Sequence, residues 1–308
     1  MKILHIGQGF IGSKLIKSLK EKEHKVDIYD LSFGDDICDR KKIHRVIKKG
    51  KYDLVVLMAA MANLNDFEKD PLKGMDVNIG GLINVANACT ESKTKLLFIS
   101  TCCVYGNTPD LPSDENSRCK PSEIYAAAKL AGEWIIKGYN RSYDLKYLIL
   151  RIATTYGPGM RGALAPAVFI NQIKKKEPIT IHGHGRQTRT LTYIDDTVGG
   201  IISVINSGAV NETFNISSEE EKSVLELAEI IKKEMRTTNH EIAFVEDRKG
   251  QTYKEQINSK KAGGWKSGGK RYAPTSGKAN NDLQWKAKVS LRRGIRKTLA
   301  WMKKNAAH

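Results

Sequence analysis

The chain is poor in cysteine and in long apolar runs. Its 308 residues include only five cysteines, and none of them forms a Cys-x-x-Cys pair. Disulfide-stabilised domains and structural zinc sites need more regular cysteine spacing, so we expect neither, and a reducing compartment fits best. The longest apolar stretch, residues 54–62, is too short to span a bilayer, and residues 1–12 lack the pattern of a secretion signal. We therefore expect a cytoplasmic protein that is not bound to a membrane.

Acidic residues are scarce in the C-terminal fifth of the chain. Residues 247–308 contain 17 Lys and Arg but only three Asp and Glu, so they carry +14 of the net charge of +17. Within them, residues 260–271 combine glycine with lysine and arginine, a composition typical of loops. Three interpretations are open: a solvated face, a basic loop that attracts an anionic ligand, or a nucleic-acid patch in which Trp265 and Tyr272 stack on bases.

A glycine-rich turn follows the first predicted strand. Residues 1–6 read as a short buried strand, and the glycines that follow have the spacing Gly-x-Gly-x-x-Gly. A helical apolar period comes next, with one face formed by Ile11, Leu15, Ile16 and Leu19. In this order of strand, turn and helix, backbone N–H groups and the helix N-terminus can approach a pyrophosphate. We therefore predict a dinucleotide site formed by Gly7, Gly9, Phe10, Ile11 and Gly12.

A carboxylate ends the second predicted strand. Asp30 stands about 20 residues after the glycine turn, where an acidic side chain accepts hydrogen bonds from the adenosine ribose hydroxyls. Asp30 therefore favours NAD over NADP as the cofactor. Arg40 and Lys41 are close enough in sequence to leave recognition of a 2′-phosphate open, and a solvated Asp at a strand end is the structural alternative.

A tyrosine and a lysine stand four residues apart in the middle of the chain. Tyr125 and Lys129 share one face if this segment is a helix. An ammonium near a phenol lowers the phenol pKa, so Tyr125 can exchange a hydroxyl proton near neutral pH. A surface lysine one turn beyond a half-buried tyrosine is the alternative. The pair follows the glycine turn and a strand that ends near Thr101, and this order favours a catalytic role.

The order of predicted elements indicates an α/β fold. In residues 1–157 strands and helices alternate as in βαβ units, which predicts a Rossmann core with a doubly wound parallel sheet. Residues 191–217 are expected to return to this core. Residues 158–190 and 218–308 are expected to form a smaller C-terminal substrate-binding lobe, with one helix that begins at Ser223 and a last helix at 290–304.

These motifs make the chain similar to the extended short-chain dehydrogenase/reductases of the nucleotide-sugar epimerase/dehydratase family, over nearly its whole length. Further matches are Asp36 and Ile37 at the family's adenine contact, residues 53–60 at its fourth strand with Ala59 and Ala60, Asn78, residues 150–158, and residues 182–196. The resemblance implies an NAD-dependent enzyme whose substrate is a nucleoside-diphosphate sugar. It adds Asp36, Ile37, Ala59, Ala60, Asn78, Tyr125 and Lys129 to the expected cofactor contacts.

The resemblance also implies catalytic roles for three residues. Thr101 is expected to hydrogen-bond the reacting sugar oxygen, and Tyr125 is expected to be the acid/base. Lys129 is expected to anchor the nicotinamide ribose and to lower the pKa of the tyrosine. A hydride would then pass from the sugar carbon to NAD.

Two further residues are expected to contact the substrate. Arg189 matches the arginine that usually binds the substrate diphosphate, a role for which a forked guanidinium is suited. Thr154 stands where the family usually has Asn, and it is the second expected contact. An ion pair of Arg189 with Asp195 or Asp196 is the structural alternative.

A pair of cysteines bears on the type of reaction. Cys102 and Cys103 stand where the family's 4,6-dehydratases have Asp-Glu and its decarboxylases usually have a Glu, so both reactions are disfavoured. Cys103 matches the catalytic cysteine of the family's 3,5-epimerases and epimerase/reductases, in which a thiol exchanges a proton beside a ketone. Residues 161–166 offer no Lys or His as the second acid/base of those enzymes. The alternative is that one of the two cysteines faces the core.

The leading hypothesis is a nucleotide-sugar 4-epimerase. The alternatives are a nucleotide-sugar 4-dehydrogenase, a 4-keto-sugar epimerase/reductase that uses Cys103, and, from another class, a nucleic-acid-binding relative with a basic C-terminal segment. An intact Tyr125 and Lys129 speak against the last. We expect a homodimer formed through the helix that carries Tyr125, where Trp134, Ile135 and Ile136 are apolar. The sequence does not identify the nucleotide or the sugar.

Overall fold

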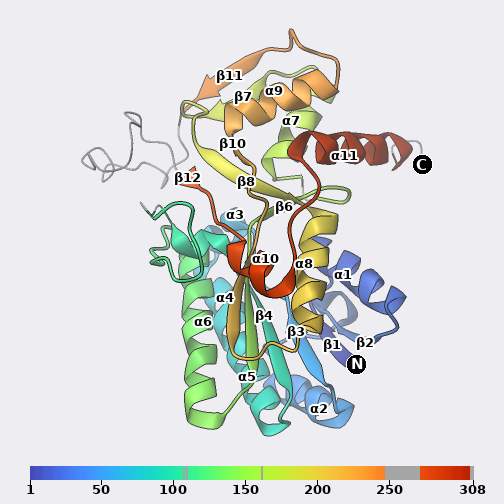
Figure 1. The fold of residues 1–308 in the computed structure, drawn as a ribbon, viewed down its shortest axis with the longest axis vertical. Coiled ribbons are helices and arrows are strands. Elements are labelled where there is room, and N and C mark those ends of the chain that lie inside the picture. The colour runs from blue at the N-terminus through green and yellow to red at the C-terminus, as the bar shows by residue number, and fades with distance from the viewer. Residues whose placement is uncertain (107, 109, 161, 247–270, 306–308) are drawn as a thin grey trace.

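A six-stranded parallel sheet forms the lower half of the molecule (Figure 1). The computed structural model describes residues 1–106, 108, 110–160, 162–246 and 271–305. The strand order is β2-β1-β3-β4-β5-β9, and every neighbouring pair is parallel. The strands are β1 (Lys2–Ile6), β2 (Lys25–Tyr29), β3 (Leu54–Leu57), β4 (Lys95–Thr101), β5 (Tyr147–Ile152) and β9 (Glu212–Ile216). The predicted Rossmann sheet is thereby confirmed.

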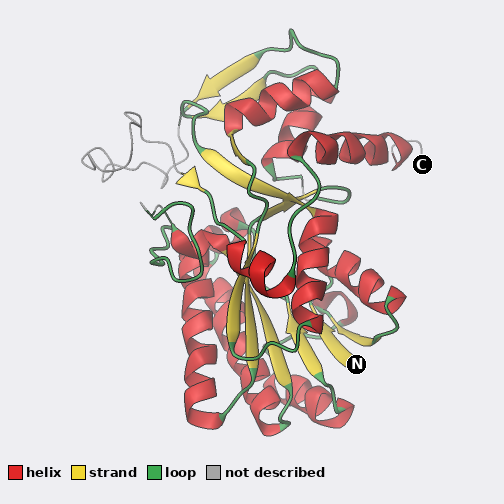
Figure 2. Cartoon of the chain, viewed as in Figure 1, coloured by secondary structure: helices red, strands yellow, loops and turns green. Residues whose placement is uncertain are grey.

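Helices cover both faces of this sheet (Figure 2). On one face α1 (Phe10–Glu21) packs against α8 (Ile194–Asn206), and on the other α2 (Arg40–Gly50), α5 (Leu82–Glu91) and α6 (Ile124–Tyr143) lie side by side. In β3, Leu54 and Val56 join the apolar cluster beneath α1 and α8, whereas Val55 and Leu57 join the cluster beneath α2 and α5. Because both faces are buried, the strand sequence is a continuous apolar run.

The segment matched to the family's fourth strand is the third strand of this chain. After β2, Asp30 caps the short 3-10 turn η1 (Leu31–Phe33), which ends at Gly34 with φ of 76°. Asp39 then caps α2, so no strand is added outside β2 in the described residues. The segment Leu54–Leu57 consequently pairs with β1 as the third strand of the chain and not the fourth.

The remaining strands and helices lie mostly above the parallel sheet in Figure 1. A mixed sheet has the order β10-β8-β12, with β6 also paired to β8, and β7 pairs with β11. These strands are β6 (Thr154–Tyr156), β7 (Ile179–His182), β8 (Thr188–Tyr193), β10 (Glu221–Ser223), β11 (Ile242–Val245) and β12 (Arg271–Tyr272). The helices are α7 (Ala165–Lys174), α9 (Val224–Glu234), α10 (Gly277–Leu283) and α11 (Leu291–Asn305). Ser223 opens α9 in a capping box with Glu226, as predicted.

One apolar cluster joins this upper lobe to the parallel sheet. It contains Leu15 of α1 and Ile201 of α8 together with Phe169 of α7, Ile231 of α9 and Ile295 of α11. Burial of these side chains in a common core fixes the lobe to α1, α8 and the parallel sheet. In the described part of the chain, no helix combines the length and the apolar character needed to cross a membrane.

The outer surface of α6 is less apolar than its sequence suggested. Trp134 is 58% exposed and Tyr143 is 64% exposed, but Ile136 is fully buried beneath the helix. Ile136 belongs to the core cluster shared with α5, so it is not available for contact with another subunit. The inclusion of Ile136 in an expected dimer surface was therefore wrong.

Candidate active site

The turn after β1 requires glycine at two positions. Gly7 has φ of 99°, and a Cβ there would lie 2.4 Å from the backbone nitrogen of Ala59. A Cβ on Gly12 would lie 2.3 Å from the carbonyl oxygen of Gly7. Since no side chain fits at either position, the chain passes from β1 into α1 in a tight turn, directly beside the residues that follow β3.

The start of α1 suits an anionic ligand. Gly9 is the N-cap residue and provides no side-chain cap. The first turn, which begins with Phe10 and Ile11, contains no acidic residue. Backbone N–H groups in the first turn of a helix have no partner within the helix, and the helix dipole adds positive potential there. A pyrophosphate would satisfy these groups, so the turn and the helix start fit the pyrophosphate of NAD.

Asp30 stands directly after β2, on the same edge of the sheet. Its Oδ2 accepts the backbone N–H of Gln8 in the glycine turn at 2.5 Å, and its Oδ1 accepts the Ser32 backbone N–H at 2.9 Å. Burial alone would raise the pKa of Asp30, but these hydrogen bonds lower it below its usual value. The carboxylate is therefore ionised and oriented beside the turn, which fits recognition of a ribose diol.

The other expected cofactor contacts lie around the same edge. Ile37 is buried against Gly81, where a Cβ would lie 2.5 Å from the Ile37 Cδ1, so the Ile37 side chain supports the loop from inside. Asp36 is exposed and accepts the Cys38 backbone N–H at 2.8 Å. Ala59 and Ala60 follow β3 and are half-buried.

Asn78 holds the loop that follows β3. It is 4% exposed and lies in the π-helical turn η2 (Asp76–Gly81), which comes after α3 (Leu64–Lys69) and α4 (Pro71–Met75). Its Oδ1 accepts the Met61 backbone N–H at 2.8 Å, and its Nδ2 donates to the Met61 carbonyl at 3.2 Å. The structure thus shows that Asn78 fixes the loop that follows β3.

Lys129 is buried on α6, one helical turn beyond Tyr125. Its Nζ donates to the carbonyl of Ile99 on β4 at 2.9 Å and lies 4.7 Å from the ring centre of Phe98. Burial lowers the pKa of Lys129 to about 8, although the charge of Glu133 raises it. Tyr125 is half-buried, with its ring edge-to-face against Phe67 at 6.2 Å between centroids. The lysine is therefore a core residue, which excludes the surface-lysine alternative.

Thr101 ends β4 two residues after the strand carbonyl that Lys129 binds. It is 8% exposed, and its Oγ1 accepts the Cys103 backbone N–H at 3.2 Å. The bond from Lys129 to Ile99 ties α6 to this end of the strand. The structure thus brings Thr101, Tyr125 and Lys129 to the carboxyl edge of the parallel sheet, where ligands bind in such folds.

The two adjacent cysteines have different surroundings in η3 (Cys102–Tyr105). Cys102 is buried, its Sγ donates to the Arg151 carbonyl at 3.1 Å, and burial raises its pKa well above the usual value. Cys103 is half-buried and follows Thr101 by two residues. Cys102 is thus the cysteine that faces the core, and Cys103 is the more exposed of the two.

Arg189 and Thr154 share one face of the mixed sheet. Thr154 on β6 pairs with Leu191 on β8, and Leu191 lies two residues after Arg189. The side chains of Thr154 and Arg189 therefore point to the same side of the sheet. Arg189 lies over the ring of Tyr272, 4.4 Å from its centre, and donates to the Thr188 carbonyl at 2.7 Å.

The alternative roles of these residues receive no support from the structure. Asp195 pairs with Lys14 and Lys297, and Asp196 accepts the backbone N–H of Val289, so neither carboxylate is engaged with Arg189. Tyr272 is covered by Arg189, so it is not an open platform for bases. Trp265 and the rest of the basic segment up to residue 270 lie outside the described residues.

Two buried polar features near the site were not predicted. Glu133 and Arg151 form a fully buried ion pair behind Lys129, and the signals for it were a glutamate four residues after the lysine and an arginine inside an apolar strand. His5 in β1 is fully buried, and neither ring nitrogen has a hydrogen-bond partner among the described residues. Burial lowers the pKa of His5 to about 4, although Asp30 raises it.

Known proteins similar to this chain agree on a family. The model of the NAD dependent epimerase/dehydratase family matches residues 7–217. A putative UDP-glucose 4-epimerase of Methanocaldococcus jannaschii is 31% identical over 97% of both chains. A dTDP-D-glucose 4,6-dehydratase of Bos taurus is 28% identical over 97% of this chain and 87% of its own length.

Solved structures show the same likeness over the whole chain. The UDP-glucose 4-epimerase of Thermotoga maritima, solved with UDP-glucose, superposes with a TM-score of 0.87 and is 25% identical, covering 99% of this chain and all of its own. The UDP-glucuronic acid 4-epimerase of Bacillus cereus, in complex with UDP-glucuronic acid and NAD, has a TM-score of 0.86 and is 26% identical, again covering 99% of this chain and all of its own.

Proposed function

The chain belongs to the NAD-dependent epimerase/dehydratase family, and we propose that within this family it is a nucleotide-sugar 4-epimerase. The observation that carries the proposal is the buried Lys129 one helical turn from Tyr125, tied to the end of β4 beside Thr101. A reversible oxidation of a sugar hydroxyl needs an acid/base at this point and no further ionisable group.

Each of the three residues has one role in the reaction. Tyr125 takes the proton from the C4 hydroxyl and later returns it, Thr101 holds the reacting oxygen, and Lys129 stabilises the phenolate form of Tyr125. Bound NAD supplies reversible acceptance of the C4 hydride. The 4-keto sugar rotates within the site, so the hydrogen returns to the opposite face of C4. The configuration at C4 is thereby inverted.

The cofactor and the substrate bind to different parts of the chain. Residues 1–157 and 191–217 hold NAD, with the pyrophosphate at the glycine turn and the adenosine ribose at Asp30. Residues 158–190 and 218–308 hold the nucleoside-diphosphate sugar, with Arg189 on the diphosphate and Thr154 beside it. The solved relatives in complex with UDP-glucose or with UDP-glucuronic acid and NAD support this choice of ligands.

Elimination of water is a poorer fit, although 4,6-dehydratases are among the relatives. Cys102 is buried, with its thiol on the Arg151 carbonyl, and neither it nor Cys103 provides a carboxylate. A second candidate is a 4-keto-sugar epimerase/reductase, because Cys103 is half-buried next to the end of β4. In that reaction Cys103 would exchange a proton at the carbon beside the ketone.

A homodimer through α6 is a further part of the proposal. Trp134 and Tyr143 remain exposed on the outer surface of this helix, and Ile135 is half-buried beside them. Light scattering after gel filtration should give twice the mass of 34.4 kDa. Trp134→Glu should then give the monomer mass.

The test of the proposed function is a proton NMR assay in deuterated water. The purified protein is mixed with UDP-, dTDP-, GDP- and CDP-hexoses and catalytic NAD. Inversion at C4 without deuterium uptake supports the 4-epimerase. Uptake of deuterium at C3 or C5 would contradict the 4-epimerase and indicate proton exchange by Cys103. Net accumulation of NADH would indicate a dehydrogenase.

A further inference from the structure

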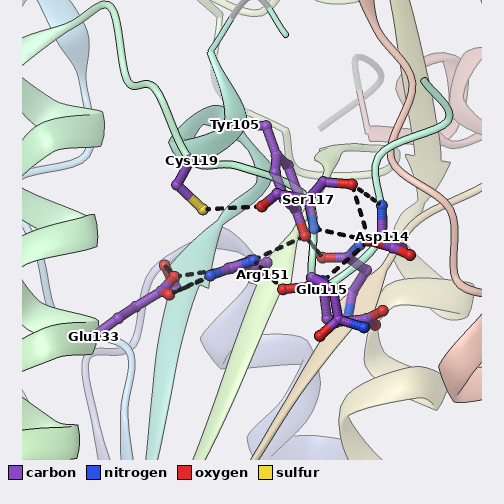
Figure 3. A network of polar contacts seen from close by, with 10 residues as sticks. Tyr105, Asp114, Glu115, Ser117, Cys119, Glu133 and Arg151 are labelled. Carbon is purple, nitrogen blue, oxygen red and sulfur yellow. Dashed lines mark hydrogen bonds and ion pairs between the residues drawn. The ribbon is translucent and has the colours of Figure 1, made fainter. Parts of the chain in front are cut away.

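Figure 3 shows a buried ion pair between Glu133 and Arg151. Glu133 lies one helical turn after the expected catalytic lysine, Lys129, on α6. Glu133 is fully buried on α6, and Arg151 is 4% exposed on β5. The Arg151 Nη2 and Nε donate to the Glu133 carboxylate at 2.7 and 3.1 Å. Ser100, the neighbour of Thr101 on β4, donates its hydroxyl to the same carboxylate at 2.5 Å.

The far side of Arg151 is also fixed. Its Nη1 donates to the hydroxyl of Tyr105 at 3.0 Å and to the Glu115 carbonyl at 3.2 Å, and the Tyr105 hydroxyl donates to Asn215 at 2.7 Å. Figure 3 shows Arg151 between Glu133 and Tyr105. The ion pair is thus held by β4, β5, β9 and η3 at once, so it cannot shift without moving the end of β4.

Tyr125, Lys129 and Glu133 follow one another at intervals of four residues, so they lie along one face of α6. The buried carboxylate of Glu133 pairs with Arg151, and its charge also acts on the buried ammonium of Lys129. This leaves positive charge beneath Tyr125, which favours its phenolate form. Since ammonium burial is unfavourable without a nearby anion, Glu133 also keeps the buried lysine protonated.

We infer that Glu133, clamped by Arg151 and Ser100, is a positioning residue that holds Lys129 charged and in place for proton transfer by Tyr125. This inference rests on the proposed role of Lys129 in 4-epimerisation. It adds a residue that contacts neither NAD nor the sugar but sets the charge state of one that does. The titratable groups of the site and of the ion-pair network are Tyr125, Cys102, Cys103, Tyr105, Cys119, Glu133 and Arg151. The helices α3, α4, η2 and α5 also pack against α6, and their charged groups are exposed: Asp66, Glu68, Lys69, Lys73, Asp76 and Glu91.

Several of these groups do not change charge near neutral pH. Burial raises the pKa of Cys102, of Tyr105 and of Cys119, so these three remain neutral. Although burial lowers it, the hydrogen bonds and charge of Glu133 raise the pKa of Arg151, so Arg151 remains a cation. The charge of Lys129 is therefore governed mainly by burial and by Glu133.

The test is the titration of Lys129 in protein labelled with ¹³C at the lysine side chains, assigned by comparison with Lys129→Met. Glu133→Gln should lower the Lys129 pKa by about one unit, because an opposite charge has been removed. The alkaline limb of the kcat/KM profile should move to lower pH by the same amount. Glu91→Gln, on the surface of α5 where Glu91 pairs with His44, should change neither.

A second variant covers the case in which Glu133→Gln does not fold because it leaves Arg151 unpaired. Glu133→Gln/Arg151→Met leaves no unpaired guanidinium and should also lower the Lys129 pKa, but by less than Glu133→Gln, because the Arg151 cation is removed as well. The titration needs no substrate, so it is independent of the proposed function. A Lys129 pKa that is unchanged in the folded variants would overturn the inference.

Discussion

The backbone N–H of Gln8 donates a 2.5 Å hydrogen bond to the Asp30 carboxylate, so the turn after β1 and the end of β2 are locked together. The Ser32 hydroxyl donates to the other oxygen at 2.6 Å. The carboxylate therefore has a fixed orientation before any ligand binds. Preorganisation of this kind lowers the entropic cost of binding.

Asp30→Asn should weaken NAD binding about 10-fold or more, because hydrogen bonds to a charged acceptor contribute about 1.5–3 kcal/mol. The same change should reduce the preference for NAD over NADP, since the anion that repels a 2′-phosphate is gone. Calorimetric titration with both dinucleotides measures both effects. The control is Asp35→Asn, which changes another carboxylate of the loop after β2, one that pairs with Lys42 of α2. Equal NAD affinity in wild type and Asp30→Asn would place the ribose elsewhere.

Tyr125→Phe should lower kcat by roughly 10²–10⁴, the usual contribution of a positioned acid/base. NAD binding and the unfolding temperature should change little, because only the hydroxyl is lost. Steady-state rates with the substrate identified by NMR measure the effect. Tyr139→Phe, at a half-buried position further along α6, should retain full activity. Full activity in Tyr125→Phe would exclude Tyr125 as the acid/base.

Arg189→Met should raise KM for the nucleotide sugar about 10- to 100-fold, since charge-assisted bonds to phosphate contribute about 1.5–3 kcal/mol. The kcat should change less, because the diphosphate does not react and its binding is similar in the ground and transition states. Arg141→Met at the end of α6 is the matched control. A fall in kcat at constant KM would contradict a diphosphate role.

His5 should make the fold sensitive to acid. Its pKa of about 4 in the folded protein lies below the unfolded value of 6.5. Between pH 4 and pH 6.5 the unfolded chain therefore binds more protons than the folded protein. The free energy of unfolding should therefore fall by about 3 kcal/mol as the pH drops from 6.5 to 4, and not change from this source above 6.5.

Urea unfolding at pH 7 and at pH 4.5 measures this dependence. His5→Leu should be less sensitive to acid than the wild type, whereas His240→Asn, at a half-buried position of the upper lobe, should behave as the wild type does. If His5→Leu and the wild type lose the same stability in acid, the buried imidazole is not the cause.

The sequence was sufficient for the fold class because its signals are local. The spacing of Gly7, Gly9 and Gly12 between a strand and a helix, and the repeated βαβ pattern, predict a Rossmann sheet with a lobe. The segment at Leu54 is the third strand and not the fourth because Asp30 caps η1 and Asp39 caps α2, which leaves no extended segment between β2 and α2. Such capping depends on backbone geometry that the residue types permit but do not require.

The meeting of the candidate site residues at one sheet edge was predictable from the sequence, but their surroundings were not. Thr101, Tyr125 and Lys129 come from two segments with local patterns, and the structure places both at one sheet edge. The pairing of Glu133 with Arg151 joins a helix to a strand, so it depends on tertiary packing that no sequence period encodes. The stacking of Arg189 on Tyr272 joins residues far apart in the chain for the same reason. The chemical roles of these residues stay predictions.

The most direct test of the account uses the nucleotide hexose that turns over in the NMR assay, labelled with deuterium at C4 and incubated in ordinary water. A 4-epimerase with a transient 4-keto intermediate should give the epimer with the deuterium still at C4 and no solvent hydrogen at any carbon. Loss of the C4 label to water, or new solvent hydrogen at C3 or C5, would contradict the account.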